Sequence, residues 1–520
     1  MITQAKTQHE DNVDLREKLT FLEVENNILR EQVRLLKAKL FGRKTEKQAV
    51  PENDGQVLLF NEAEEFSVAT EEKEEAVSIQ GYSRKKRGRR PLPEGLPRVD
   101  VIHDLKEEEK LCACGCMKSR IGEDVSEQLD IIPAKMQVIR NIRYKYVCRN
   151  CEGVEAEEPA VKIAPMPEQM IPKSMATPGL LAHVITAKFV DAIPFYRQER
   201  QFNRLGIELP RSTMCGWAIK AAERCEPLIE LLNEEIRSGP LINIDETTVQ
   251  VMKEDGRLNT NKSYMWIFLG GDQERPALTY RYNPTRSGDV ASEYLKGYKG
   301  YVQTDGYAGY DFLDKEAGVI HAGCWAHARR KFVEVISASG KRKGVKGRTG
   351  NAEKAVDYIA RLYAVEKEAK KQGLNAKELR DKRVEKAEPV LKEFKEWLDK
   401  TYPMTPPKGL LGSAISYALK QWDRLTRYVE DGRISPDNNL AENAIRPFVV
   451  GRKNWLFSGH PNGAKASATL YSLIETAKAN NIEPYGYLRC LFEKLPSAHS
   501  TDDYKSLLPN RIDKALLSML

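Results

Sequence analysis

Three acidic residues that lie far apart in the sequence have the surroundings expected of metal ligands. Asp245 lies inside the strand-like run INIDET, where a charge among isoleucines is unfavourable unless it is paired or binds a metal ion. Asp305 ends the strand-like run GYVQTD. If the two strands are neighbours, both carboxylates face one edge of a sheet, and a divalent cation that relieves their repulsion can activate water or a 3′-hydroxyl for attack on a phosphodiester. Either Asp alone is more often a turn or strand-end residue, but the two in this order favour a metal site.

A third acid, Glu442, lies in the helix-like stretch DNNLAENAIRPFVVGRKNW. Two metal ions about 3.5 to 4 Å apart usually need a third carboxylate, and we assign that role to Glu442. Arg446 follows one helical turn later on the same face, and with Arg452 and Lys453 it is predicted to contact DNA phosphates. A lone Glu on a helix is otherwise most often a solvated residue, so the assignment depends on the two Asp residues.

The elements around these acids follow a defined order. Three β-rich runs lie at residues 241–251, 263–271 and 276–283. They are followed by a helix-like piece at 286–296, a strand at 300–310 and a helical segment. The strand GVIHAGCW and the helix AHARRKFVEVI come last. This is the order of an RNase H-like core, a three-layer α/β fold with acids on the first and fourth strands of a mixed sheet. Residues 337–435 are helix-rich and charged, and predict a helical insertion before the helix of Glu442. Within it, GKRKGVKGR either contacts DNA or is a solvated loop.

Five of the nine cysteines cluster in CACGC and CRNC. Four thiolates from two such knuckles can form a tetrahedral structural Zn²⁺ site, which would stabilise a small module without a core of its own. Between the knuckles, residues 121–147 alternate apolar and polar positions, as the strands of a β-ribbon do. Free thiols are the alternative. The predicted ligands are Cys112, Cys114, Cys148 and Cys151, with Cys116 as a substitute for Cys114.

The N-terminal segment has a heptad pattern. It predicts a four-heptad coiled coil that ends at Gly42, in which a buried Asn26 favours an in-register pair of chains. An amphipathic helix packed on its own chain is the alternative. The stripe consists of Leu15, Leu19, Leu22, Asn26, Leu29, Val33, Leu36 and Leu40.

An acidic, polar linker at 48–80 leads to the basic run SRKKRGRRPLP. Prolines prevent a helix there, and an extended basic arm can lie along phosphates or enter a minor groove. We therefore predict DNA contacts by Arg87, Arg89 and Arg90, although many basic runs are merely solvated.

Residues 177–236 are helix-like and resemble a helix-turn-helix in outline. Gly206 lies in the expected turn, and Ser212 or Thr213 is a candidate N-cap for the helix after Pro210. Arg211 is the predicted DNA contact of this region. Plain helical packing is an equal alternative.

Composition and length set the remaining expectations. The 520 residues exceed the size of a usual single core, and 82 Lys and Arg against 75 Asp and Glu give a net charge of +7, so clusters of charge matter more than their sum. Without a signal peptide pattern or a membrane-length apolar run, we expect a cytoplasmic, nucleoid-associated protein with no membrane contact. The predicted domains are a dimerisation helix at 1–47, a linker with basic arm at 48–98, a zinc module at 99–165, a helical DNA-binding region at 166–238, the catalytic core at 239–470 and a C-terminal helical element at 471–520.

Long motifs along nearly the whole chain resemble those of the insertion-sequence-66 family of transposases, members of the DDE class. In order they are LFGRKTEK, GRRPLP, IGEDVSEQLDIIPA, NIDETTVQV, QTDGYAGY, GCWAHARRKF, NNLAENAIRPFVVGRKNWLFSG and NNIEPYGYLRCLFEKLP. The resemblance implies that Asp245, Asp305 and Glu442 are the catalytic acids and bind Mg²⁺ or Mn²⁺. It also places Cys324 and His327 in a CWAH motif, which either supports the fold or has a metal or DNA role.

The implied activity is cleavage at the ends of a mobile element, followed by attack of the new 3′-hydroxyl on target DNA with the metal ions stabilising the developing charge. The implied partners are double-stranded DNA of the element ends and target, further copies of the chain in a homodimer or higher oligomer, and accessory proteins of the same element. The alternatives are a DNA-binding regulator or inactive transposase-derived protein without catalysis, and a nuclease that stops at hydrolysis.

Overall fold

The computed structural model describes residues 2–41, 136–147, 161–339 and 350–517. The chain divides into two compact units, one made of residues 1–45 and 167–520 and the other of residues 46–166. The predicted zinc ligands Cys112, Cys114, Cys116, Cys148 and Cys151, and the arm residues Arg87, Arg89 and Arg90, lie outside the described residues.

In the second unit, the described residues form one antiparallel strand pair. β1 (Lys145–Val147) pairs with β2 (Val161–Ile163), so that Tyr146 lies opposite Lys162. Residues 136–144, which the alternating pattern predicts as strand, have no regular secondary structure. The predicted ribbon is therefore limited to its last three residues within the described part.

A five-stranded mixed sheet forms the centre of the first unit. Its strands are β3 (Leu241–Gln250), β4 (Lys262–Asp272), β5 (Arg275–Asn283), β6 (Gly300–Gln303) and β7 (Val319–Ala322). The spatial order is β5-β4-β3-β6-β7, with β3 antiparallel to β4 and parallel to β6. The strand of Asp245 is thus the direct neighbour of the strand that precedes Asp305.

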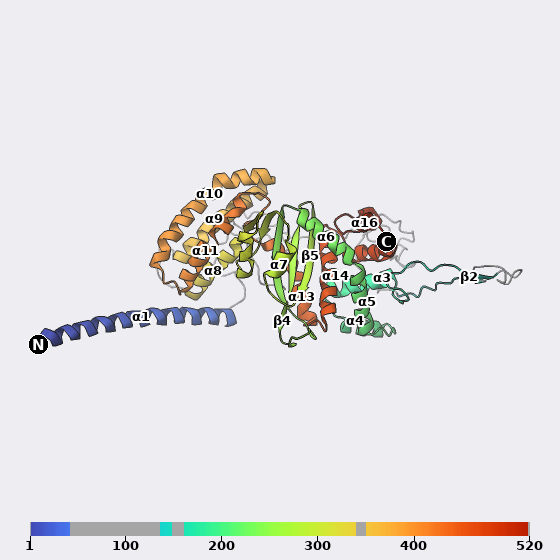
Figure 1. The fold of residues 1–520 in the computed structure, drawn as a ribbon, viewed down its shortest axis with the longest axis horizontal. Helices are drawn as coiled ribbons and strands as arrows, with labels where there is room; N and C mark the ends of the chain where they lie inside the picture. Colours follow the sequence, from blue (N-terminus) through green and yellow to red (C-terminus); the bar gives the residue numbers. More distant parts are fainter. Residues whose placement is uncertain (1, 42–135, 148–160, 340–349, 518–520) are drawn as a thin grey trace, which may run out of the picture. The chain divides into compact units, whose positions relative to one another are not determined.

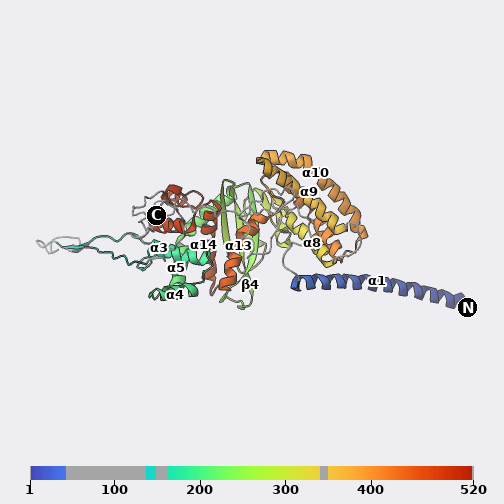
Figure 2. The same cartoon turned by 180° about the vertical axis from the view of Figure 1, so that it is seen from behind.

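Helices cover both faces of this sheet, as Figures 1 and 2 show from opposite sides. Successive residues of β5 mark the two faces. Thr279 donates a hydrogen bond of 2.8 Å to Asn233 on α6 (Glu226–Ser238), whereas the hydroxyl of Tyr280 donates to the Ala444 carbonyl on α13 (Asn439–Trp455). The helix α7 (Asp289–Tyr294) shares the side of α6, because Tyr294 also donates to Asn233.

Side chains of α14 (Pro461–Ala479) cover the sheet edge that β5 forms. Ser472 accepts a hydrogen bond from the Tyr280 backbone N–H at 2.7 Å, and Thr476 both accepts from Leu278 N–H and donates to its carbonyl. An edge strand otherwise presents unpaired backbone groups that invite pairing with another chain. α14 therefore protects β5 by hydrogen bonds as well as by packing.

Three further helices, α3 (Pro178–Phe189), α4 (Phe195–Arg204) and α5 (Arg211–Arg224), precede α6. The capping prediction is wrong here, because Ser212 and Thr213 lie within α5 and Pro210 is the N-cap residue. The Glu199 carboxylate on α4 instead accepts a hydrogen bond of 3.0 Å from the Arg211 N–H. A side chain from the preceding helix thus accepts the hydrogen bond from a backbone N–H that a local N-cap side chain would otherwise accept.

Five helices follow β7: α8 (Trp325–Ser339), α9 (Asn351–Gln372), α10 (Ala376–Thr401), α11 (Leu410–Lys420) and α12 (Trp422–Thr426). The last four lie within the predicted insertion at 337–435, whereas α8 begins before it. These helices share a hydrophobic core of their own, which includes Trp325, Phe332 and Phe394. After α14 the chain continues into α15 (Pro484–Lys494) and α16 (Thr501–Ser506).

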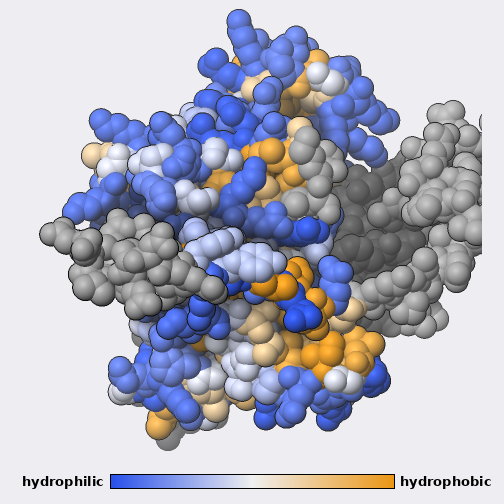
Figure 3. Space-filling model, turned by 90° about the vertical axis from the view of Figure 1, so that its right-hand side faces the viewer, coloured by the Kyte–Doolittle hydropathy of each residue, from blue (hydrophilic) through white to orange (hydrophobic). Residues whose placement is uncertain are grey.

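The N-terminal helix α1 spans Ile2–Phe41, which agrees with the predicted helix end. Its apolar stripe is exposed, with Leu22 at 60% and Leu29 at 55% of their full accessibility. No described helix is long and apolar enough to cross a membrane. On the face of the molecule drawn in Figure 3, hydrophilic side chains predominate and hydrophobic ones form smaller areas between them.

Candidate active site

Two adjacent acids on β3 have opposite surroundings. Glu246 is almost fully buried and pairs with Arg286, whose Nη2 lies 2.5 Å from its Oε1, and it also accepts a hydrogen bond from the Tyr310 hydroxyl. Asp245 faces the other side of the sheet, as alternation along a strand requires, and its Oδ1 accepts a hydrogen bond of 2.8 Å from the Glu246 N–H. Glu246 therefore has a structural partner, and Asp245 belongs to the face covered by α13.

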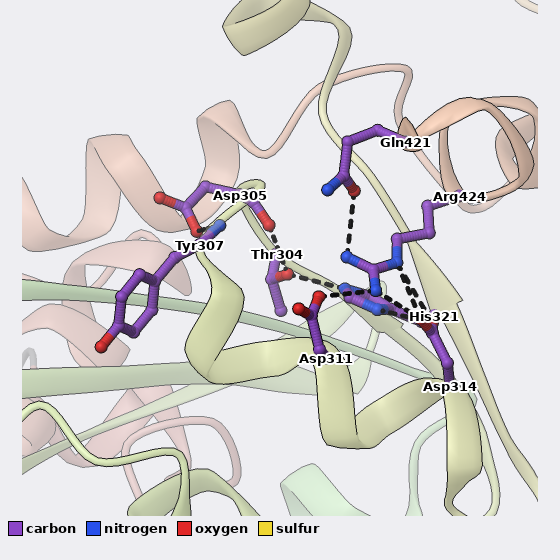
Figure 4. Close-up of polar contacts among 8 residues, drawn as sticks. All are labelled: Thr304, Asp305, Tyr307, Asp311, Asp314, His321, Gln421 and Arg424. Carbon is purple, nitrogen blue, oxygen red and sulfur yellow. Dashed lines mark hydrogen bonds and ion pairs between the residues drawn. The ribbon is translucent and has the colours of Figure 1, made fainter. Parts of the chain in front are cut away.

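Asp305 lies two residues beyond the end of β6, and so the prediction that it ends the strand is corrected. The chain turns at once: Asp305 Oδ1 accepts a hydrogen bond of 2.9 Å from Tyr307 N–H (Figure 4). Such a turn within two residues satisfies a backbone donor where strand pairing has stopped. It leaves the second carboxylate oxygen of Asp305 outside this turn.

A chain of polar contacts supports the backbone at Asp305 (Figure 4). The Thr304 hydroxyl lies 2.8 Å from His321 Nε2, and His321 Nδ1 lies 3.1 Å from Asp314 Oδ1. Arg424 on α12 in turn donates to Asp311 and Asp314. Burial lowers the pKa of His321 to about 4, although Asp314 opposes this. The neutral ring therefore donates from Nδ1 to Asp314, while Nε2 faces the Thr304 hydroxyl, which also donates to the Asp305 carbonyl at 2.8 Å.

Glu442 lies in the first turn of α13, and Asn438, the N-cap residue, fixes that helix end on the sheet. The Asn438 side chain donates to the Ile244 carbonyl at 2.8 Å and accepts from Asn243 Nδ2 at 2.9 Å. Its backbone N–H donates to Cys324 Sγ at 3.2 Å. The residue is 1% exposed, so these bonds are shielded from water and hold the start of α13 against β3.

Gln303 completes this buried network. It accepts a hydrogen bond from Asn243 at 2.9 Å and donates to the carbonyls of Ser435 and Gly323, at 2.7 and 3.0 Å. Asn243 and Gln303 are also the paired residues of β3 and β6. The two acid-bearing segments of the sheet and the segment that enters α13 are thereby joined through satisfied polar groups, which rigidify a site when every member has a partner.

The three predicted acids interact electrostatically. Burial raises the pKa of Asp245 well above its ordinary value, and the charges of Glu246, Glu442 and Asp305 add to the effect. Burial also raises the pKa of Glu442, with Arg330 opposing and Asp437 and Asp305 adding. The charges of these acids therefore act on one another, and a bound cation would relieve the repulsion. Asp245 and Asp305 are not part of the group of ligand atoms within 4.8 Å of one another that includes Glu442 in the described part of the chain.

Two residues of the CWAH motif lie beside Glu442. His327 Nδ1 is 3.6 Å from Glu442 Oε1, and the ligand atoms of Cys324, His327 and Glu442 all lie within 4.8 Å of one another. Burial lowers the pKa of His327 to about 4, so its ring is neutral near pH 7. Burial raises the pKa of the Cys324 thiol to about 12, which keeps its proton on.

The predicted DNA-contact residues within the described part are placed as follows. Arg446 is partly exposed on α13, and its charge lowers the pKa of Glu442. Arg452 donates to the hydroxyls of Thr247 and Thr248 on β3, at 3.3 and 3.2 Å, and Lys453 beside it is exposed. Arg211 is exposed at the start of α5, which is a different element from those that carry the three acids.

The sequence alone did not single out Asn243, Gln303 or His321. Asn243 had a usable signal, because it alternates with Asp245 and so shares its face of β3. Gln303 and His321 had none, since their partners are set by which strands become neighbours.

Four family models match the chain. They are the transposase IS66 family over residues 173–466, the zinc-finger binding domain of transposase IS66 over 109–152, the model described as transposase C of IS166 homeodomain over 28–101, and the IS66 C-terminal element over 472–510. The first alone spans more than half of the chain, and it contains all three acids.

Curated relatives are similar over most of their length. The uncharacterized protein y4jD of Sinorhizobium fredii is 33% identical over 446 residues, which is 83% of each chain. The uncharacterized protein y4qI of the same organism is 29% identical over 92% of this chain and 87% of its own. No solved structure matches significantly. With the family model and these relatives in agreement, the chain belongs to the IS66 family of transposases.

Proposed function

We propose that this transposase cleaves DNA at the ends of an insertion sequence and joins the resulting 3′-hydroxyl to target DNA. The observation that carries the proposal is the electrostatic interaction of three acids from separate segments: the charges of Asp305 and Glu442 raise the pKa of Asp245, and the charge of Asp305 also raises that of Glu442. A DNA-binding regulator has no use for three crowded acids, which cost stability when they are not neutralised.

The order of the sheet supports an RNase H-like core. Three antiparallel strands are followed by two that run parallel to the first, and the first strand lies at the centre. Asp245 lies on that central strand, Asp305 lies just past its parallel neighbour, and Glu442 comes from a helix on one face. This is the arrangement expected from the sequence pattern.

The residues fit a pair of divalent cations, Mg²⁺ or Mn²⁺. Asp245, Asp305 and Glu442 would hold them, and Glu442 Oε1 is a buried oxygen with no hydrogen-bond partner among the described residues. When bound, the cations would supply activation of the attacking oxygen and stabilise charge on both oxygens of an in-line displacement. An all-oxygen set of carboxylates matches the preference of these ions.

The protein's own residues would orient the reaction. Asn438 and Gln303 hold the first turn of α13 against the central strand β3, so Glu442 is presented in one position. Arg446 and Lys453 would contact the phosphate backbone, while Arg452 anchors the far end of α13 to β3. Such preorganisation avoids a reorganisation cost when charge develops.

Recognition of the element ends would fall to other segments. The zinc-finger match supports a structural Zn²⁺, for which Cys112, Cys114 or Cys116, Cys148 and Cys151 are the proposed ligands. Arg87, Arg89, Arg90 and Arg211 would add contacts to DNA. The exposed leucines of α1 would pair two chains as a coiled coil, so that two DNA ends are held together.

A strand-transfer assay tests the proposal. Full-length protein, labelled element-end DNA and a target plasmid are combined with and without Mg²⁺, using wild type, Glu442→Gln and the exposed control Glu396→Gln. We expect metal-dependent joined products with wild type and the control, and a loss of at least 10³-fold with Glu442→Gln, on the scale of losing a main charge-stabilising group.

The two stages can be scored separately. Cleaved ends without joined products would indicate a nuclease that stops at hydrolysis. Specific binding of the ends with neither product, under conditions where the protein is folded and zinc-loaded, would overturn the proposed catalysis in favour of a regulator.

A further inference from the structure

The pair His327 and Glu442 is the feature of the site that the three-acid proposal leaves unexplained. Their side chains are 23% and 15% exposed, and Nδ1 and Oε1 face each other across 3.6 Å. Each of these atoms is fully shielded and has no hydrogen-bond partner within the described part of the chain. A buried polar atom without a partner is costly, so two that face each other require a cause.

The separation suits two ligands of one ion. Around an octahedral ion with bonds of about 2.1 Å, neighbouring ligand atoms lie about 3 Å apart and opposite ones about 4.2 Å. The observed 3.6 Å lies between these limits and is longer than a hydrogen bond. Small rotations of the imidazole and the carboxylate would bring both atoms to bonding distance of a single ion.

We propose that His327 Nδ1 is a fourth protein ligand of the cation site, binding the same ion as Glu442. This inference rests on the proposed function, because it adds a nitrogen donor to the site of the three acids. Asp305 also lies close to His327, since its charge acts on the ring.

Cys324 is excluded as a ligand although it lies within the same cluster. Its Sγ already accepts the hydrogen bond from Asn438 N–H at 3.2 Å, and the residue is 1% exposed. Moving that sulfur to an ion would release the N-cap residue of α13 and with it the position of Glu442. Cys324 is therefore a positioning residue, and of the two CWAH residues only His327 would contact the cation.

The nitrogen donor has a chemical consequence. Carboxylate oxygens suit Mg²⁺ and Mn²⁺, whereas an imidazole favours transition metals over Mg²⁺. The site should thus prefer Mn²⁺ to Mg²⁺ more strongly than a site built from three carboxylates alone.

Pulsed electron paramagnetic resonance of the Mn²⁺-loaded, full-length protein tests this directly. We expect a ¹⁴N hyperfine coupling from the imidazole in wild type and in His183→Gln, whose histidine is exposed. The coupling should vanish in His327→Gln, with Mn²⁺ affinity reduced about tenfold or more. In His327→Asp, Mn²⁺ should still bind, but without the nitrogen signal and with a weaker preference for Mn²⁺ over Mg²⁺. This variant therefore distinguishes loss of the imidazole ligand from misfolding.

The outcomes distinguish the inference from the function on which it rests. Mn²⁺ bound without a nitrogen coupling, in an amount that Glu442→Gln abolishes, would overturn the role of His327 and leave the three-acid site standing. Mn²⁺ binding that neither Asp245→Asn nor Glu442→Gln reduces would overturn both.

Discussion

Neighbouring acids on one strand can differ in their partners. Glu246 is paired with Arg286 and bonded to Tyr310, and both partners oppose the rise in its pKa that burial causes. Asp245 is crowded by Glu442 and Asp305, and its pKa is raised well above the ordinary value chiefly by burial. In the absence of a cation, the charged form of Asp245 therefore opposes folding.

Replacing Asp245 by Asn should stabilise the metal-free protein while it destroys the site. The acid is charged in the unfolded chain above about pH 4, and its raised pKa in the folded state makes the folded protein bind more protons. The gain from Asp245→Asn is therefore absent at low pH, grows as pH rises through the raised pKa and is complete above it. We expect about 1 kcal/mol near neutral pH, measured by urea unfolding without Mg²⁺.

The neighbouring substitution supplies the contrast. Glu246→Gln weakens the pairing with Arg286, and it should destabilise the protein with or without Mg²⁺. Added Mg²⁺ should raise the stability of wild type but not of Asp245→Asn. Equal stability of wild type and Asp245→Asn at neutral pH without Mg²⁺ would contradict the crowding of these acids.

Helices and strands could be predicted from the sequence where the pattern lies within a short segment of the chain. The β-rich composition of three runs placed β3, β4 and β5 to within a residue or two, and the turn residues separated them. β6 was predicted too long, because GYVQTDGYAGY keeps a β-rich composition after pairing with β3 and β7 has ended at Gln303. Sequence composition reports propensity, whereas a strand ends where its partners end.

Contacts between distant residues were beyond the sequence. Asn438 binds Asn243 across 195 positions, and Glu199 satisfies the Arg211 N–H where a local Ser or Thr cap was expected. Both depend on which elements pack together, which no window along the chain encodes. The acids themselves were identifiable, because a charge inside an apolar strand is anomalous without any knowledge of its partners.

The helix α1 carries a prediction at the scale of one element. The described leucines of its heptad stripe, Leu19, Leu22, Leu29 and Leu36, are more than half exposed, so an apolar stripe on this 40-residue helix is left uncovered. Leu22→Asp combined with Leu29→Asp should shift the protein from dimer to monomer in sedimentation, because a charge at the seam has no partner. Asn27→Asp, which adds a charge outside the stripe, should remain dimeric.

The loss of dimerisation should also be visible in the DNA products. If two chains hold two ends, the Leu22→Asp and Leu29→Asp double variant should lose paired-end joining more than single-end cleavage. Joining at the wild-type rate by a monomeric variant would show that α1 has another role.

At the scale of the whole molecule, the predicted acids and the zinc-finger match fall in different compact units. The three acids lie in the unit that contains residues 167–520, whereas the zinc-finger match lies in residues 109–152 of the other unit. The net charge of +7 is small for a chain of this length. Affinity for DNA must therefore come from local basic segments, whose contribution falls with salt.

We predict that loss of zinc weakens DNA binding but leaves the stability of the sheet-containing unit unchanged. Cys148→Ser with Cys151→Ser should weaken binding of element-end DNA about tenfold or more at moderate salt, because the module that lacks its own core loses its metal. Thermal unfolding of the sheet-containing unit should be unchanged, since its hydrophobic cores lie within residues 170–512. Cys215→Ser, which alters an exposed thiol of that unit, is the matched control. A parallel fall in core stability would show that the units fold together, and unchanged binding would remove the zinc module from DNA recognition.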